Sequence, residues 1–413
     1  MFNSTTLPNG LRLIHQEDKS TQMVAVNTLY KVGSRNEDPQ HTGFAHLFEH
    51  LMFGGSVNIP DYDTPLQMAS GENNAYTSAD FTNYYITIPA DNIETAFWLE
   101  SDRMLSLAFS KQSLEVQRKV VMEEFKQNYL NQPYGDLGHL LFDLSYKVHP
   151  YRWPTIGLQL SHIADAKMAD VKRFFKKFYR PDNAILAVVG NISWERTIEL
   201  VNKWYGDIPK GTVNMEKDKI PNEPKQKRQR RKTVRRDVPN SIIVMAFHIP
   251  SIMHPDFTAC DMLSDVLANG KSSRMYQHLV VESRLFVSAE ASVIGRVDSG
   301  LFVVEAVIAP GADIDQCEKA LWKELYDMHN QAFDEREITK LKNKFEANHN
   351  MQNINFLNRA QNMAHCEAYG DVNLLNNEVE RYCKTDAKKL NEVAKNFIRK
   401  SNSNVLRYLA KVQ

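Results

Sequence analysis

Long apolar runs are absent from this chain of 413 residues, in which no stretch reaches about 18 consecutive apolar residues. A helix that crosses a membrane needs about 20 mainly apolar residues, so the sequence predicts no membrane-spanning segment. The N-terminal residues also lack the apolar centre of a signal peptide. We therefore expect a soluble protein and take the cytoplasm as its location, although a chain whose targeting segment had been removed would have the same sequence.

An excess of charge of one sign is also absent, because 50 Lys and Arg residues offset 50 Asp and Glu residues. Such a chain has no overall field that would attract nucleic acid or an anionic membrane, and we expect neither as a partner. The close cysteine spacing of zinc knuckles and redox motifs is absent too, since Cys260, Cys317, Cys366 and Cys383 lie far apart. We interpret these cysteines as reduced structural thiols.

The length predicts two domains, because single hydrophobic cores rarely serve much more than about 250 residues. Residues 211–236 are polar, contain two prolines and carry eight Lys or Arg between 225 and 236. No aromatic residues for base stacking interleave with these charges, which favours a solvated linker over a nucleic-acid site. We therefore predict a linker at 211–236 between an N-terminal domain at 1–210 and a homologous C-terminal domain at 237–413.

The sequence pattern of each half predicts strands followed by long helices. In the first half, strands are expected near 10–18, 23–32, 82–89 and 184–192, with helical spacing of apolar residues at 41–54, 92–107 and 112–130. The second half follows a similar plan, although the identity between the halves is too slight to prove duplication. The expected fold class is α+β, with two homologous domains that are each a mixed β-sheet with helices packed on one face.

The sharpest local signal is the HxxEH pattern formed by His46, Glu49 and His50 in a segment with helical spacing. Residues i, i+3 and i+4 of a helix lie on neighbouring parts of one face, so both histidines can reach one metal ion with the glutamate beside them. Imidazole nitrogens suit zinc, and a carboxylate that is not a ligand can take a proton from water. The order is the inverse of the more common HExxH arrangement.

The motif needs a third ligand, because random placement of 13 histidines would give HxxEH in roughly 2 to 3% of such chains. Glu123 and Glu124 are the candidates, since this pair of acids interrupts an apolar helical run. Helix geometry lets only one of the two point easily at the site. For Glu123 we favour the solvated face of the helix.

Several sequence segments, in this order along the chain, indicate a family. The chain resembles the pitrilysin or insulinase metallopeptidases, and most of all the branch of mitochondrial processing peptidase and its bacterial relatives. The resemblance spans the whole chain and rests on HTGFAHLFEHLMFGGS, GENNAYTSADFTNYY, VVMEEF, HPYRWPTIG, FYRPDNAILAVVGNI, YGDIP and, in the second half, LANGKSSRMYQHL.

The resemblance implies roles for individual residues. In such enzymes the two histidines and a glutamate about 75 residues downstream bind zinc, which corresponds here to His46, His50 and Glu124. Glu49 corresponds to the general base that activates water. The implied cofactor is Zn²⁺, and the implied reaction is hydrolysis of peptide bonds.

Asn74 and Ala75 correspond to an edge-strand segment with which the family pairs the extended backbone of its substrate. An edge strand has unpaired amide and carbonyl groups that a peptide can satisfy, so the physical interpretation agrees. The alternative for Asn74 is a turn residue.

Two departures from the family pattern predict an incomplete site. Gln117 replaces a glutamate seven residues before the zinc glutamate, and the neutral amide adds no negative charge. Val280 and Val287 occupy the places of an Arg and a Tyr that contact the substrate carbonyl. Valine cannot donate a hydrogen bond, and Arg284 is out of register. Loss of such donors normally costs several kcal/mol of transition-state stabilisation.

The sequence therefore predicts a zinc endopeptidase that acts on unfolded peptides or presequence-like segments. Relatives close a chamber from four domains, so we expect a heterodimer in which a zinc-less homologous subunit supplies the Arg and Tyr. A homodimer is the other arrangement, and a catalytically weak structural or assembly subunit on the same fold is the rival function.

Overall fold

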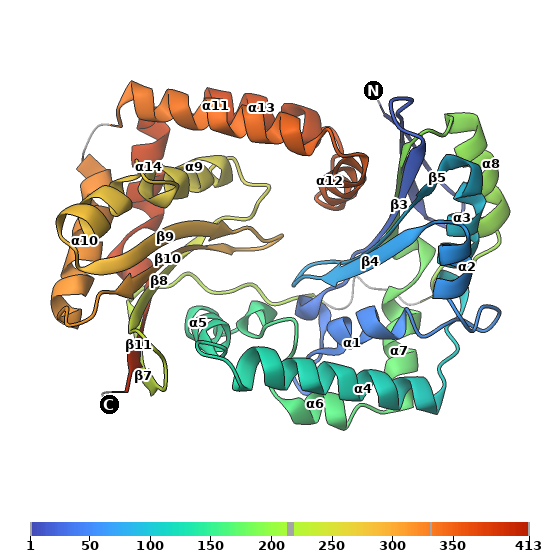
Figure 1. Ribbon diagram of the computed structural model, residues 1–413, viewed down its shortest axis with the longest axis horizontal. Helices are drawn as coiled ribbons and strands as arrows, with labels where there is room; N and C mark the ends of the chain where they lie inside the picture. Colours follow the sequence, from blue (N-terminus) through green and yellow to red (C-terminus); the bar gives the residue numbers. More distant parts are fainter. Residues whose placement is uncertain (1, 213–218, 331–332, 412–413) are drawn as a thin grey trace. The chain divides into compact units, whose positions relative to one another are not determined.

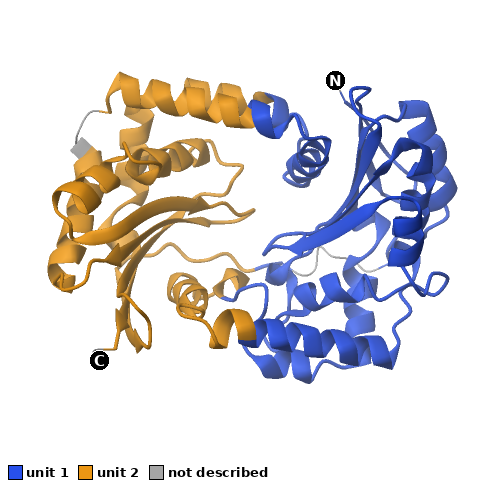
Figure 2. Ribbon diagram, in the orientation of Figure 1, with its two compact units in different colours: residues 1–126, 153–220, 350–376 blue, residues 127–152, 221–349, 377–413 orange. Residues whose placement is uncertain are grey.

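The computed structural model describes residues 2–212, 219–330 and 333–411 (Figure 1). The chain divides into two compact units (Figure 2). Unit 1 comprises residues 1–126, 153–220 and 350–376, and unit 2 comprises 127–152, 221–349 and 377–413. Among the described residues, every helix is too short or too polar to span a bilayer.

Unit 1 is built on a mixed six-stranded sheet with the strand order β1-β2-β6-β3-β5-β4. Strands β2 and β6 pair in parallel, and the other neighbours are antiparallel. The central strands β3 and β6 are buried along almost their whole length, which indicates that both faces of the sheet are covered. The strands are β1 Asn3–Thr6, β2 Arg12–Glu17, β3 Met23–Tyr30, β4 Glu72–Thr77, β5 Thr82–Pro89 and β6 Ala184–Gly190.

Helices α1, α3 and α8 cover one face of this sheet. The strand pairing places Thr77, Thr28 and His15 on that face. Their side chains contact α1, α3 and α8, respectively. Tyr76 precedes Thr77 and therefore points to the opposite face, where its hydroxyl meets His365 of α12. The helices of unit 1 are α1 Phe44–Leu51, α2 Asp63–Met68, α3 Ile93–Leu105, α4 Lys111–Phe125, α6 Leu160–Ala164, α7 Met168–Phe178, α8 Trp194–Tyr205 and α12 Phe356–Ala368.

Unit 2 repeats the topology on a mixed five-stranded sheet with the order β7-β11-β8-β10-β9. As in unit 1, one parallel pair, β7 with β11, is followed by antiparallel neighbours. The α+β prediction with a mixed sheet in each half is therefore confirmed. The elements are β7 Arg230–Arg236, β8 Ile242–Ile249, β9 Phe286–Ile294, β10 Gly300–Ile308, β11 Ser403–Ala410, α5 Leu137–Ser145, α9 Phe257–Ala268, α10 Ile314–Asn330, α11 Glu335–Gln352, α13 Leu374–Lys384 and α14 Ala387–Phe397.

The predicted boundary at 211–236 does not account for two segments. Each of them packs in the unit that is formed mainly by the other half of the chain. Helix α5, from the first half, packs against β7, β8 and β11 of unit 2. Helix α12, from the second half, packs against β3 and β6 of unit 1. Two ion pairs hold α12 there, Arg12 with Glu367 at 2.6 Å and Arg359 with Asp18. A helix on the second face of the unit 1 sheet was also not expected.

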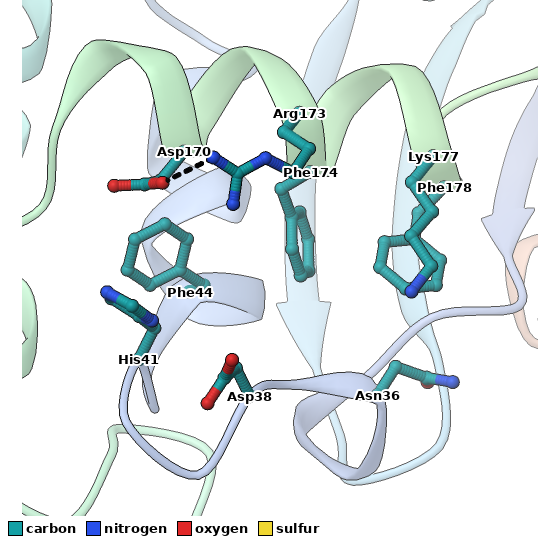
Figure 3. A pocket seen from close by; sticks show the side chains of 9 residues that line it. All are labelled: Asn36, Asp38, His41, Phe44, Asp170, Arg173, Phe174, Lys177 and Phe178. Atoms are coloured by element: carbon teal, nitrogen blue, oxygen red, sulfur yellow. Dashed lines mark ion pairs between the residues drawn. The ribbon is translucent and has the colours of Figure 1, made fainter. Parts of the chain in front are cut away.

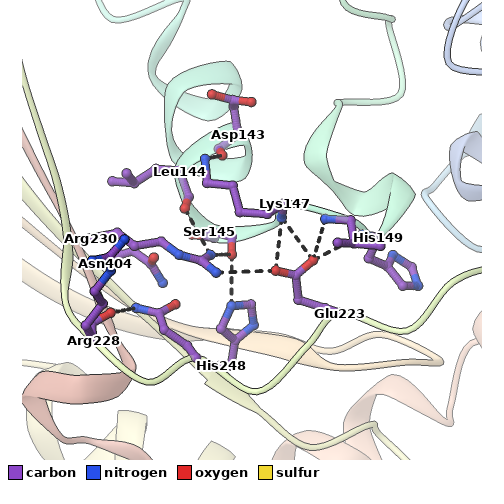
Figure 4. A network of polar contacts seen from close by, with 12 residues as sticks. Asp143, Leu144, Ser145, Lys147, His149, Glu223, Arg228, Arg230, His248 and Asn404 are labelled. Carbon is purple, nitrogen blue, oxygen red and sulfur yellow. Dashed lines mark hydrogen bonds and ion pairs between the residues drawn. The ribbon is translucent and has the colours of Figure 1, made fainter.

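The predicted linker is wrong for its second part, because residues 230–236 form the edge strand β7 beside β11. Positively charged side chains suit an exposed edge strand, and here they pair with acids such as Glu318, which Arg231 contacts at 2.6 Å. The preceding segment is also anchored, since the buried Glu223 carboxylate accepts backbone N–H groups of residues 147–149 (Figure 4). The part of the linker at 213–218 lies outside the described residues.

Acid is expected to weaken the docking of α12. Burial lowers the pKa of His365 to about 4. A histidine with a lowered pKa binds fewer protons when folded, so its contribution to stability is present above about pH 6.5 and is lost as pH falls towards 4. The loss is at most about 3 kcal/mol. The free energy of unfolding from pH 7 to 4 should therefore fall less steeply in His365→Gln than in the parent.

The control for this measurement is His254→Gln, which replaces an exposed histidine of unit 2. Its pH profile should match that of the parent. Parallel profiles for the parent and His365→Gln would contradict the assignment.

Candidate metal centre

Helix α1 presents the HxxEH residues because its other face is buried. Five of its eight residues, Phe44, Ala45, Leu47, Phe48 and Leu51, lie in the core. His46, Glu49 and His50 occupy the remaining face and are only partly exposed. The amphipathic pattern thus fixes which side chains can reach a ligand outside the helix.

The start of α1 is held by a buried carboxylate. Glu37 accepts the backbone N–H groups of Gly43 at 2.9 Å and Ala45 at 2.8 Å, and the indole N–H of Trp153 at 3.1 Å. Gly43 has a φ of 89°, and an added Cβ would lie 2.6 Å from the carbonyl oxygen of Ile156. Glycine is therefore required where the chain enters the helix.

Glu124 of α4 lies against the two histidines of α1. Its Oε2 atom is 3.6 Å from His46 Nε2 and 3.5 Å from His50 Nε2. One candidate ligand atom from each of the three residues lies within 4.8 Å of the others, and no other such group of His, Cys, Asp or Glu occurs among the described residues. Tetrahedral zinc with bonds of about 2.1 Å separates its ligands by roughly 3.4 Å, and the two distances between histidine nitrogen and Glu124 oxygen are close to that spacing.

Electrostatics favours the ligand form of His46. Burial lowers its pKa to about 4, and the neighbouring His50 lowers it further in the same direction. The imidazole is therefore neutral near pH 7, as a metal ligand must be. Together with His50 and Glu124, the site has two nitrogen donors and one oxygen donor. Such a three-ligand set leaves a fourth tetrahedral position for water or substrate.

Glu49 is held beside this group by Thr77 of β4. The Thr77 hydroxyl donates a 2.6 Å hydrogen bond to Glu49 Oε2. Burial raises the pKa of Glu49, although the Thr77 hydrogen bond acts in the opposite direction. A carboxylate whose pKa moves towards neutrality is better suited to accept a proton and donate it again.

Two other α4 residues lie as helical periodicity predicts. The Glu123 side chain is 60% exposed and its Oε1 pairs with Lys126 at 2.7 Å, so it faces solvent rather than the histidines. Gln117 lies two turns before Glu124 and therefore on the same side of the helix. The structure thus separates the two adjacent acids that the sequence left as alternatives.

Asn74 and Ala75 lie inside β4, which pairs with β5 and ends the strand order of the unit 1 sheet. The turn alternative for Asn74 is therefore wrong. Among the described residues, the other edge of β4 has no strand partner. Asn74 Oδ1 accepts the backbone N–H of Ala75 at 2.7 Å. The edge is available for an added strand.

The two valines of the second half lie at different depths in unit 2. Val280 packs against the hydrophobic core of that unit, whereas Val287 is on the edge strand β9 and is 55% exposed. Arg284 lies between them with a φ of 55°, a left-handed conformation that redirects the chain there. Neither valine side chain adds a hydrogen-bond donor to unit 2.

Sequence reasoning missed two residues that support the site, Thr77 and Glu37. For Thr77 a signal was present, because strand alternation places it on the same face as Ala75. For Glu37 the sequence contained no comparable signal, since its partners depend on how the loop before α1 folds.

A cavity of unit 1, of about 180 Å³, lies between the start of α1 and α7 (Figure 3). Three phenylalanine rings, Phe44, Phe174 and Phe178, line it together with charged residues such as Arg173, which pairs with Asp170 at 3.0 Å. None of the three candidate metal ligands lines it. The candidate metal ligands are therefore separate from this cavity.

The fold and the group formed by His46, His50 and Glu124 can now be compared with known proteins, and these comparisons name a family. The model of the family "Insulinase (Peptidase family M16)" matches residues 12–141, and that of "Peptidase M16 inactive domain" matches 165–345. The Zinc protease PqqE of Helicobacter pylori is 32% identical over 347 residues, which cover 82% of this chain and 77% of the relative. This chain belongs to peptidase family M16, as the resemblance predicted at the family level.

Solved structures agree with this fold. The crystal structure of a protease from Helicobacter pylori has a TM-score of 0.92 at 28% identity and covers 99% of both chains. A peptidase M16 inactive domain from Pseudomonas fluorescens has a TM-score of 0.90 at 14% identity, covering 100% of this chain and 98% of the other. At 14% identity the second likeness concerns the fold alone.

Proposed function

We propose that this chain is a zinc-dependent endopeptidase and the zinc-bearing subunit of a dimeric chamber, acting on unfolded peptides or presequence-like segments. The observation that carries the proposal is the convergence of His46, His50 and Glu124 within 4.8 Å. The proximity of Glu49, oriented by Thr77, supports a hydrolytic role. The name of the Helicobacter pylori relative, a zinc protease, supports the choice of metal.

The reaction follows from the positions of the side chains. His46, His50 and Glu124 would hold zinc, which when bound polarises a peptide carbonyl and lowers the pKa of water. Glu49 accepts the proton of the attacking water and donates it to the leaving amine. Thr77 keeps the Glu49 carboxylate oriented throughout.

The edge strand β4 is proposed as the substrate-binding element. A peptide that adds to its free edge beside Asn74 and Ala75 would form main-chain hydrogen bonds that do not depend on sequence. Since Thr77 of the same strand contacts Glu49, a peptide in this register would pass next to the proposed base. This arrangement favours extended, unfolded substrates.

Loss of a ligand should release the metal. We expect His46→Ala and Glu124→Gln to lower zinc content from about one per chain to below roughly 0.1 after dialysis, because two protein ligands hold zinc poorly. Atomic absorption of the purified variants measures this content. Glu123→Gln is the matched control, since it changes the adjacent acid that faces solvent, and it should retain full zinc. Normal zinc in both ligand variants would refute the site.

A zinc-less homologous subunit is the proposed partner, as in the branch of mitochondrial processing peptidase. Val280 and Val287 supply no donor for the oxyanion of the transition state. The match of residues 165–345 to an inactive domain of the family supports a second half without catalytic groups. An Arg and a Tyr from the partner would then complete the site.

Adding that partner should raise activity. We expect a zinc-less relative encoded next to this chain to form a complex with it and to raise peptide cleavage at least about 100-fold, the usual effect of one oxyanion donor. Size-exclusion chromatography and a fluorogenic peptide assay measure the two effects. A homodimer of this chain whose activity is unchanged by the relative would count against the heterodimer.

An assembly subunit on the same fold is the second candidate function, and the inactive-domain match is the observation that favours it. Stoichiometric zinc in the purified chain would favour the peptidase, because a scaffold does not need the metal. A zinc-free chain that still enters a stable complex would favour the scaffold.

A further inference from the structure

Strand β4, the proposed substrate-binding element, is supported by main-chain hydrogen bonds on one side only. It pairs with β5 along Glu72–Thr77 and, among the described residues, has no strand partner on its other edge. An edge strand therefore has one ladder of main-chain bonds where a central strand has two. A peptide that adds to this edge binds more tightly if the strand is already ordered, because ordering it on binding costs free energy. The side chains that hold β4 thus bear on substrate affinity.

Two adjacent side chains hold the end of β4 from opposite faces of the sheet. On one face, the Thr77 hydroxyl donates to Glu49 of α1 at 2.6 Å. Tyr76 points to the other face, because successive side chains of a strand alternate. There its hydroxyl lies 3.2 Å from Nε2 of His365 in α12, and the two ring centres are 6.1 Å apart. The end of β4 is therefore fixed between α1 and α12.

The hydrogen bond between Tyr76 and His365 joins two neutral groups. Burial lowers the pKa of His365 to about 4, and burial raises the pKa of Tyr76, so both are uncharged near pH 7. A neutral imidazole has one donor and one acceptor nitrogen, and a phenol can serve either. The His365 ring also lies 5.9 Å from that of Phe81, in the turn between β4 and β5. The same histidine thus contacts the strand and the turn that follows it.

Helix α12 is anchored independently of this hydrogen bond. It belongs to the same compact unit as the sheet (Figure 2). It packs against the central strands β3 and β6, and Glu367 pairs with Arg12 of β2 at 2.6 Å. In the strand order, β2 and β4 lie on opposite sides of these central strands, so α12 crosses the sheet from β2 to β4. A helix fixed in this way can support an edge strand.

We propose that Tyr76 and His365 are positioning residues that hold β4 ready to receive a peptide, so that α12 sets the affinity for substrate. This inference rests on the proposed function, in which a peptide adds to β4 beside Asn74 and Ala75. The Tyr76–His365 bond lies on the face of the sheet opposite to Glu49. Its contribution therefore belongs to substrate binding and not to proton transfer.

Steady-state kinetics of the full chain test this role. Tyr76→Phe and His365→Leu each remove the hydrogen bond. We expect each to raise KM for a fluorogenic unstructured peptide about threefold to tenfold, the usual effect of one hydrogen bond. Both kcat and zinc content should stay within about twofold of the parent, since a rise in KM alone reports lost binding. The double variant should resemble either single variant, because both substitutions remove the same bond.

Two further variants separate this bond from a general loosening of α12. His365→Gln places an amide where Nε2 can bond to Tyr76, so KM should stay within about twofold of the parent. Glu367→Gln weakens the pair with Arg12 at the β2 side of the helix and should also leave KM within about twofold. A rise in KM for Glu367→Gln equal to that for His365→Leu, or a fall in kcat without a rise in KM, would overturn the proposal.

Hydrogen exchange tests the same bond without any activity. Amide exchange at residues 72–77, followed by mass spectrometry, should be at least about fivefold faster in Tyr76→Phe and His365→Leu than in the parent. Exchange at residues 3–6, in β1 at the opposite edge of the sheet, should not change. Unchanged exchange at β4 would overturn the proposal. A parent that cleaves no peptide would reject the proposed function, and faster exchange at β4 would still support the role of the pair in holding the strand.

Discussion

Glu49→Gln is expected to lower kcat for peptide cleavage by at least about 10³-fold while zinc content stays near one per chain. General acid–base catalysis contributes typically about 10²- to 10⁴-fold, and Glu49 is the proposed carrier of the proton in both directions. The amide of Gln cannot take up that proton. The amide oxygen of Gln can still accept a hydrogen bond from the Thr77 hydroxyl, so the substitution removes the base with little change in packing.

The measurement pairs a fluorogenic unstructured peptide with zinc analysis of the same sample. Glu123→Gln changes a solvent-facing acid of α4 and is the matched Glu to Gln control. It should keep both activity and zinc. Full activity of Glu49→Gln with full zinc would remove the base assignment. Zinc loss in Glu49→Gln would instead indicate that Glu49 binds the metal. The group of His46, His50 and Glu124 would then lack one of the ligands.

The central part of this site could be predicted because it is local. His46, Glu49 and His50 lie within two turns of one helix, so periodicity alone places them on one face. The third ligand was harder to predict, because the spacing along α4 allowed either Glu123 or Glu124. The family resemblance indicated Glu124. Thr77 was missed because its contact with Glu49 depends on how β4 packs against α1.

The fold was predictable where patterns are local and unpredictable where they are not. Strand β6, with seven buried residues in a row, is evident from its apolar run. The docking of α12 on β3 and β6 is not evident, because an amphipathic helix shows which face it buries but not against which sheet. The basic segment 230–236 was misinterpreted because its composition is that of a linker, while its pairing with β11 stems from distant residues.

A buried arginine of α3 should contribute strongly to the stability of unit 1. Arg103 is 1% exposed and forms an ion pair with Glu100, whose carboxylate also accepts the hydroxyls of Tyr62 and Thr28. The guanidinium carbon lies 4.4 Å from the ring centre of Tyr84, and that tyrosine hydroxyl reaches the carbonyl oxygen of Phe48 in α1. The cluster therefore links the core of unit 1 to the helix that carries the histidines.

Arg103→Met is expected to lower the free energy of unfolding by about 3–5 kcal/mol, because it leaves the Glu100 carboxylate buried without its partner. Thermal and urea unfolding of the isolated chain measure the loss. Arg173→Met is the control, since Arg173 is 74% exposed in its pair with Asp170, and it should cost less than about 1 kcal/mol.

The double variant Glu100→Gln with Arg103→Met separates loss of packing from loss of charge compensation. Because the unpaired charge is then removed, it should recover a large part of the stability that Arg103→Met loses. A double variant no more stable than Arg103→Met would mean that the aromatic contacts of the guanidinium, with Tyr84 at 4.4 Å, contribute more than the ion pair. Arg103→Met as stable as the parent would contradict both explanations, and α1 would then be held without this cluster.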